Sequence, residues 1–544
     1  MSALHRLGSL LLAAALAAGA SACERSVRTN GAPLEPASSR VRFDITSDPA
    51  TLDPLFAHAD ANAVEAQLAR LAFEPFVDID ERGQPIPILL QSIPTKTNGG
   101  ISGDGLTITY QLRHGVHWHD GPEVTARDVL FTLAAIRDDR NPIRSRAGYD
   151  RIASATSPDP YTVIVQLKAP WAPAVATIFS YGTAPQYVLP AHLLEKETDL
   201  AKSDFGAHPI GNGPYRFVAW HRGESVTYEA NPSYWRGMPR LSRIEARIVS
   251  DPGTNLTLLR TGEIDWNLVA PIQQKTLGER TDLHYRYVPL AVVFGITINT
   301  KHPPFDDVRV RRALAASIDR AGISTKITYG RYPVIDTAQP LSSWARDPAV
   351  KLPAYDPRAA DALLDAAGWK RGPDGMRLKN GKPFTLSYVQ FPESTTGVRA
   401  ATVIQSELKL RGITMNIRPV PNAQLFLPKS QGGTLATGAY DLAYVPWPMG
   451  ADPDDSFMLA CDGASNYMRY CNRTVDALEK RAVTVTSQDE RKAIYAKIER
   501  IVAADVPVVY LFNPSYIYAY RDGLGGFWPN AFSPTWNAVD WTKP

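Results

Sequence analysis

The chain has 544 residues, which is too long for one hydrophobic core and predicts about three or four folding units. Its hydrophobic content of 44% and charged content of 21% are ordinary for a soluble globular protein. The formal net charge of +3 gives no reason to expect a nucleic-acid partner, which would need a concentrated basic face.

Residues 1–22 are typical of a secretory signal peptide. An apolar run from Leu10 to Ala18 is followed by the small residues Ala20-Ser21-Ala22 and then by Cys23. This order resembles a bacterial lipobox, although Ala20 stands where Leu is more usual, so we expect Cys23 to be the lipidated first residue. Ordinary cleavage beside an incidental Cys is the alternative. Residues 23–40 lack apolar periodicity and predict a flexible tether. No other apolar run reaches the roughly 20 residues needed to span a bilayer.

A strand, a turn and a helix are predicted between residues 106 and 133. Alternating apolar residues predict a half-buried strand that ends at Leu112. Asp120-Gly121-Pro122 then favours a turn, because Gly permits positive φ and Pro presets the backbone. Thr125 is a suitable helix N-cap, and Asp128 stands at the capping-box position three residues later.

Three histidines at positions 114, 117 and 119 raise the alternative of a metal site, since imidazole binds Zn, Cu and Ni. On a strand, His117 and His119 would share one face and His114 would not. No Cys or nearby acidic set completes a tetrahedral site. We therefore interpret this stretch as a folding element and expect no metal or other cofactor.

Several short motifs carry a resemblance to a known family. They are Trp118-His119-Asp120-Gly121, Gly211-Asn-Gly-Pro-Tyr215, Asn231 to Gly237, and Pro304 to Arg320. The Gly-rich motif is a poor phosphate loop, because Pro and a strand follow it and no helix N-terminus is offered. Over nearly all of residues 41–544, the chain resembles the family 5 extracellular solute-binding proteins, which deliver peptides, nickel complexes and related solutes to ABC importers.

The resemblance implies an α/β fold of the type II periplasmic-binding-protein kind. Two lobes with mixed sheets are expected, with a hinge between them and an extra subdomain in the first lobe. Residues 41–291 would form the first part of lobe I, with the subdomain at about 80–205. Residues 292–510 would form lobe II, and residues 511–544 would return to lobe I. We expect one long strand from Val508 to Tyr520 at this return.

The same resemblance implies a substrate-binding lipoprotein of an ABC importer. Its expected partners are a peptide or related small solute, the permease and ATPase complex, and the membrane through the lipid anchor. A periplasmic or other extracytoplasmic monomer is expected. An exported hydrolase is the alternative from another class, but the chain has no Gly-x-Ser-x-Gly and no His-Glu-x-x-His motif. A lipoprotein that senses a ligand without transport is a third reading.

Cys461 and Cys471 are predicted to form a disulfide. Two cysteines close in sequence in an exported chain favour this pairing, and their spacing lacks the second half of a zinc motif. Peptide-binding relatives carry a similar local pair.

The ligand site is where the chain departs from its dipeptide-binding relatives. Trp447 matches a Trp near the end of a second-lobe strand in those relatives, and core packing is the alternative to a ligand contact. Met449 or Gly450 stands where they carry an Asp for the peptide amino terminus. Phe391 stands where they carry an Arg for the carboxylate. These two departures favour a longer, blocked or modified peptide, or another amphipathic solute, over a free dipeptide, and no catalytic residues are expected. The expected ligand-binding residues are Trp447, Met449, Asp452, Phe391, Ser47 and Tyr444.

Overall fold

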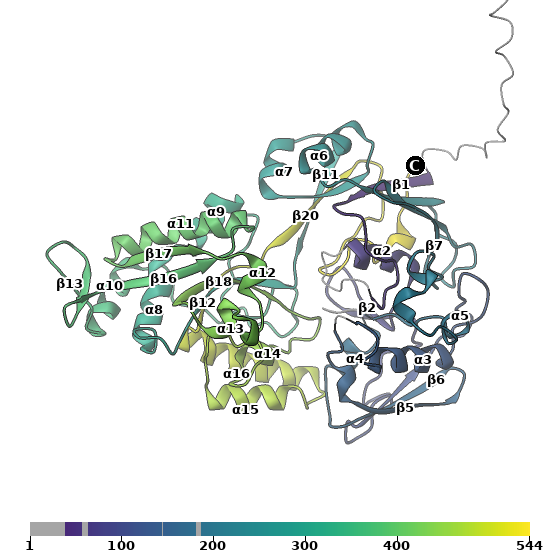
Figure 1. The fold of residues 1–544 in the computed structure, drawn as a ribbon, viewed down its shortest axis with the longest axis horizontal. Helices are drawn as coiled ribbons and strands as arrows, with labels where there is room; N and C mark the ends of the chain where they lie inside the picture. The colour runs from purple at the N-terminus through teal and green to yellow at the C-terminus, as the bar shows by residue number, and fades with distance from the viewer. Residues whose placement is uncertain (1–38, 57–63, 144, 181–185) are drawn as a thin grey trace, which may run out of the picture.

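The computed structural model describes residues 39–56, 64–143, 145–180 and 186–544. The expected signal peptide and Cys23 lie outside these residues. Figure 1 shows two bodies side by side, which we call lobe I and lobe II. Among the described helices, none combines the length and the apolar composition needed to cross a membrane.

Lobe I is built on a seven-stranded mixed sheet with the order β11-β20-β10-β1-β9-β8-β7. Strand β1 is central and runs parallel to both β9 and β10, whereas the other neighbouring strands are antiparallel. The strands are β1 (Arg40–Ile45), β7 (Tyr215–His221), β8 (Ser225–Ala230), β9 (Arg243–Ile248), β10 (Trp266–Val269), β11 (Leu283–Pro289) and β20 (Ser515–Arg521). Three helices accompany them, α2 (Val64–Ala72), α6 (Pro252–Thr261) and α7 (Pro271–Leu277).

A smaller three-stranded sheet, β4-β6-β5, packs below this layer in Figure 1. The strands of this sheet are β4 (Thr107–Gln111), β5 (Ile152–Asp159) and β6 (Thr162–Leu167). The neighbouring hairpin consists of β2 (Val77–Ile79) and β3 (Pro85–Pro87). The helices of this part of the chain are α3 (Ala126–Arg137), α4 (Ala174–Thr177) and α5 (Ala191–Leu194). Helix α3 begins directly after Thr125, and the Asp128 carboxylate accepts a hydrogen bond from the Thr125 N–H at 2.8 Å. The predicted strand, turn and helix are thus present.

Two of the sequence motifs meet at His119. Its Nδ1 accepts a hydrogen bond from the Gly211 N–H at 3.2 Å, so the remaining ring proton is on Nε2, which lies 3.0 Å from the Gly213 carbonyl. Burial lowers the pKa of His119 to about 4, which keeps the ring neutral. Glycines are required here, because a Cβ at either position would overlap the Ala72 carbonyl group. In the described ranges, no group of three or more His, Cys, Asp or Glu side chains is placed to hold a metal ion.

Lobe II is built on a five-stranded sheet with the order β17-β16-β18-β12-β19. The strands are β12 (Val292–Ile298), β16 (Thr385–Gln390), β17 (Thr414–Pro419), β18 (Leu442–Pro448) and β19 (Val508–Phe512). The helices are α8 (Val308–Ser317), α9 (Arg320–Thr328), α10 (Pro357–Ala366), α11 (Thr395–Leu410), α12 (Asn422–Leu425), α13 (Thr434–Thr437), α14 (Ser456–Leu459), α15 (Arg473–Ala482) and α16 (Gln488–Asp505). The expected disulfide joins Cys461 to Cys471 with an S–S distance of 2.14 Å.

The chain crosses between the lobes twice, from β11 to β12 and from β19 to β20. The expected single strand from Val508 to Tyr520 is instead two strands in different sheets, separated at Asn513-Pro514. Pro514 has no N–H for a sheet ladder. The buried Asn513 amide group donates to the carbonyls of Leu290 at 2.8 Å and Val292 at 2.7 Å. Together with the Leu290 N–H, which donates to the Pro514 carbonyl at 2.9 Å, this side chain ties the two crossing segments together.

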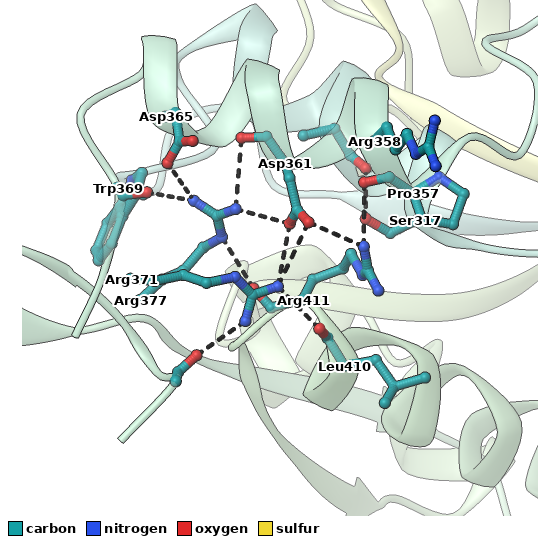
Figure 2. A network of polar contacts seen from close by, with 12 residues as sticks. Ser317, Pro357, Arg358, Asp361, Asp365, Trp369, Arg371, Arg377, Leu410 and Arg411 are labelled. Atoms are coloured by element: carbon teal, nitrogen blue, oxygen red, sulfur yellow. Dashed lines mark hydrogen bonds and ion pairs between the residues drawn. The ribbon is translucent and has the colours of Figure 1, made fainter. Parts of the chain in front are cut away.

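A small sheet projects from the far end of lobe II. It consists of β13 (Lys370–Arg371), β14 (Arg377–Lys379) and β15 (Lys382–Pro383). Figure 2 shows how Arg377 fixes it to helix α10. The Arg377 guanidinium is 1% exposed and binds Asp361 at 2.6 Å and Asp365 at 2.8 Å. Asp361 also binds Arg371 and Arg411, so one carboxylate joins three guanidinium groups.

Candidate functional site: an aromatic cavity at the lobe crossing

A cavity of about 670 Å³ lies on lobe II beside the lobe crossing. None of its lining residues carries a charge, and eight of them are aromatic. The lining residues are Leu290, Val292, Phe294, Tyr332, Ser394, Thr396, Asn422, Phe426, Tyr444, Pro446, Trp447, Pro448, Phe457, Ser465, Tyr467, Phe512 and Pro514. Such a wall attracts apolar and planar groups and offers a few hydroxyl and amide groups for hydrogen bonds.

Three parts of lobe II and the crossing segments form this wall. Strand β18 supplies Tyr444 and Trp447, and the two crossing segments close one side of the cavity. Helix α11 can approach Tyr444 because position 397 is glycine. A Cβ there would lie 2.6 Å from the Tyr444 ring. The loop closed by the disulfide carries two more lining residues, Ser465 and Tyr467.

Trp447 forms the base of the cavity. Its side chain is 1% exposed and packs against Tyr467 and Phe457, with ring centroids 5.4 and 6.5 Å away. The indole Nε1–H is buried and has no hydrogen-bond partner among the described residues. A buried donor without a partner is costly, and a ligand acceptor that reached this atom would remove that cost.

The structure brings together only part of the expected site. Trp447 and Tyr444 line the cavity, whereas Phe391, Met449 and Asp452 do not. Phe391 lies behind Tyr444, with ring centroids 5.7 Å apart. The N–H of Met449 donates to the Ala291 carbonyl at 2.7 Å, and its side chain is in the core.

Asp452 and Ser47 lie elsewhere in the fold. Asp452 is 2.5 Å from the guanidinium of Arg491, which is itself largely buried. Burial raises the pKa of Asp452, and the bonds from Arg491 oppose this effect. Ser47 is exposed just beyond β1 in lobe I. A ligand contact by Phe391, Met449, Asp452 or Ser47 stays a prediction.

Sequence reasoning missed most of the aromatic wall. Phe426, Phe457 and Tyr467 lie in loops or at helix ends, where no periodic pattern marks a side chain as buried or facing a cavity. The only local signal was the closeness of Phe457 and Tyr467 to the Cys461–Cys471 pair, which restrains the loop containing Tyr467.

Comparisons with known proteins agree with this architecture. Residues 84–469 match the model of the family described as bacterial extracellular solute-binding proteins, family 5. Protein XP55 of Streptomyces lividans is 29% identical over 540 residues, which cover 95% of this chain and 91% of that protein. The oligopeptide-binding protein AppA of Bacillus subtilis is 25% identical and covers 86% of this chain and 89% of that protein.

A solved structure shows the same fold. The crystal structure of NikZ from Campylobacter jejuni in complex with Ni(L-His) aligns with a TM-score of 0.74 at 25% identity. The alignment covers 93% of this chain and all of that chain. The family match spans well over half of the sequence, and the two-lobed arrangement agrees with it. The chain therefore belongs to the family 5 bacterial extracellular solute-binding proteins.

Proposed function

We propose that this protein is the substrate-binding lipoprotein of an ABC importer and captures peptides between its two lobes. The preferred peptides are longer, blocked or modified, rather than free dipeptides. The protein binds its ligand without chemical change and delivers it to the membrane permease. Relatives described as oligopeptide-, di/tripeptide- and glutathione-binding proteins support the peptide class.

The observation that carries this proposal is the uncharged aromatic wall of the 670 Å³ cavity. A free dipeptide has two charged termini close together, and moving a charge out of water without a partner is strongly unfavourable. A longer or blocked peptide can place neutral backbone and side chains in this cavity while its termini lie elsewhere. Ser394, Thr396 and Asn422 can then bond the peptide amides.

The first test is mass spectrometry of small molecules that co-purify with the protein from its native host, followed by calorimetry with the identified compound. Peptides of three or more residues, or peptides with blocked ends, are the expected result. Tight binding of simple unblocked dipeptides would contradict the preference. Cleavage of the bound peptide by purified protein would contradict a purely binding role.

Lipid anchoring and coupling to transport need separate tests. Cys23→Ser should release the protein from the membrane fraction, because the proposed lipid is attached to that side chain. Uptake of the identified ligand should fall when the gene is deleted. Normal uptake together with a changed transcriptional response would favour a sensor.

A further inference from the structure

A second cavity, of about 390 Å³, lies in lobe I at the carboxyl ends of the parallel strands β1 and β10. This edge of an open α/β sheet is where such folds bind ligands. Tyr516 and Tyr518 of strand β20 form part of its wall. Pro514, two residues earlier, lines the aromatic cavity of lobe II. Two residues of extended chain span about 7 Å, so the two cavities flank the same crossing segment.

The lobe I cavity differs in chemistry from the aromatic cavity. Asp44 is the one charged side chain among the described residues that line either cavity. Its Oδ1 atom is buried and has no hydrogen-bond partner among the described residues. The basic residue opposite Asp44 on strand β9 is Arg247, which is bonded instead to Glu245 at 2.8 Å.

Two further lining side chains leave buried polar atoms unsatisfied. Asn255 is 6% exposed and Trp266 is 2% exposed. Asn255 Oδ1 and Trp266 Nε1 have no partner in the described part of the chain, although the Asn255 amide group donates to the Val249 carbonyl. Buried polar atoms are rarely left without partners, so three of them around one cavity indicate a polar occupant.

The charge and the aromatic rings define which occupant fits. Two of the three unsatisfied atoms, Asp44 Oδ1 and Asn255 Oδ1, are acceptors, so the occupant must donate hydrogen bonds. Burial raises the pKa of Asp44 to about 7, and a cation beside it would restore the charged carboxylate. The rings of Tyr516 and Tyr518 add faces that attract cations.

We propose that the lobe I cavity binds an ammonium or guanidinium group of the same ligand that occupies the aromatic cavity, with Asp44 as its counter-ion. This inference rests on the proposed function, because it assigns one end of the captured peptide to each lobe. The cation comes either from the peptide amino terminus or from a Lys or Arg side chain. Such a ligand bridges the lobes and favours the arrangement in which they close around it.

The test begins with a defined peptide mixture, a tryptic digest of casein, incubated with the purified full-length protein. Retained peptides are identified by mass spectrometry, and the most strongly retained one is synthesised in three forms. The first is unmodified, the second is N-acetylated, and the third has norleucine or citrulline in place of Lys or Arg. Calorimetry then compares wild type, Asp44→Asn and the control Asp522→Asn. Asp522 is exposed beyond the opposite end of β20, so the control removes the same charge from lobe I outside the cavity.

Asp44→Asn should weaken binding of the unmodified peptide by about 10- to 100-fold, as expected for loss of a charge-assisted contact. Asp44→Asn should not change the affinity for the peptide form that lacks the bound cation. If that form is the N-acetylated peptide, the cation is the amino terminus; if it is the norleucine or citrulline peptide, the cation is the Lys or Arg side chain. Asp522→Asn should bind like wild type. Asp44→Ser is the second variant if Asp44→Asn does not fold.

Two results would overturn the inference in distinguishable ways. If wild type retains peptides and Asp44→Asn binds the cationic form equally well, the lobe I cavity is a hydrated pocket and the proposed function stands. If wild type retains no peptide from the digest, the peptide-binding function fails and this inference fails with it.

Discussion

The indole N–H of Trp447 is buried without a hydrogen-bond partner among the described residues, so removing it should affect protein stability and ligand affinity differently. In Trp447→Phe the aromatic base of the cavity is kept and the donor is removed. In the ligand-free protein the donor has no partner, so its loss relieves a cost of about 1–3 kcal/mol. The smaller ring loses packing against Tyr467 and Phe457 worth about 1–2 kcal/mol. The free energy of unfolding should therefore fall by no more than about 1 kcal/mol and can rise by up to about 2 kcal/mol.

Ligand binding should respond more strongly. If an acceptor of the ligand satisfies the Trp447 donor, losing that bond costs about 1–3 kcal/mol, or about 5- to 150-fold in Kd. The harsher variant, Trp447→Ala, should lose about 2–4 kcal/mol of binding. It should also lose about 3–5 kcal/mol of stability, because the side chain is 1% exposed. Calorimetry with the co-purified ligand and urea unfolding of the free protein measure the two quantities.

Trp369 provides a matched control. Its Nε1 is also buried without a partner among the described residues, and its ring stacks on Phe384 at 4.4 Å in a part of lobe II that does not line the cavity. Trp369→Phe should leave affinity unchanged. Wild-type affinity in Trp447→Phe, or an equal loss in both variants, would refute the assignment of the indole donor to the ligand.

Three further predictions concern stability. Burial raises the pKa of Asp455 to about 6 and that of Glu499 to about 7, so the folded state holds protons that the unfolded state releases above about pH 4. Stability should therefore decrease as the pH rises from about 4 through 7, and Glu499→Gln should flatten the dependence of the urea midpoint on pH. Arg377→Met should cost about 2–3 kcal/mol of stability and leave ligand affinity unchanged, because its ion pairs are partly buried and remote from the cavity. Replacing Cys461 and Cys471 with Ser should cost about 3 kcal/mol by the chain-entropy model and also weaken ligand binding, because the freed loop carries part of the cavity wall; equal affinity would contradict this.

The sequence predicted elements best where the signal is local. The helix after Thr125 depends on a cap and a turn that lie within eight residues, and both are present. The division between β19 and β20 was missed because the apolar alternation continues in both strands. Pro514 was visible in the sequence, but the hydrogen bonds of the Asn513 side chain depend on a segment more than 200 residues away.

The site was less predictable than the fold for the same physical reason. Trp447 was singled out because it matched a Trp of the relatives, and the structure places it with Tyr444 on β18 at the cavity. Asp44 alternates with apolar residues along β1 and so has the pattern of a solvated position. Its burial results from α6, β10 and β20, which surround it only in the folded protein. No sequence pattern shows that a buried polar atom lacks a hydrogen-bond partner.

The aromatic cavity lies where the chain crosses between the lobes, so a ligand bound in it can affect the angle between the lobes. Leu290 and Val292 line the cavity, and their carbonyls are the two acceptors of the Asn513 amide. Pro514, on the second crossing, lines the same cavity. A ligand that fills the cavity thus touches the backbone whose dihedral angles must change when the lobes rotate. A ligand shifts a conformational balance only through contacts that differ between the two arrangements. Contacts at the crossing meet this condition, whereas contacts confined to the interior of one lobe would persist in both arrangements and shift nothing.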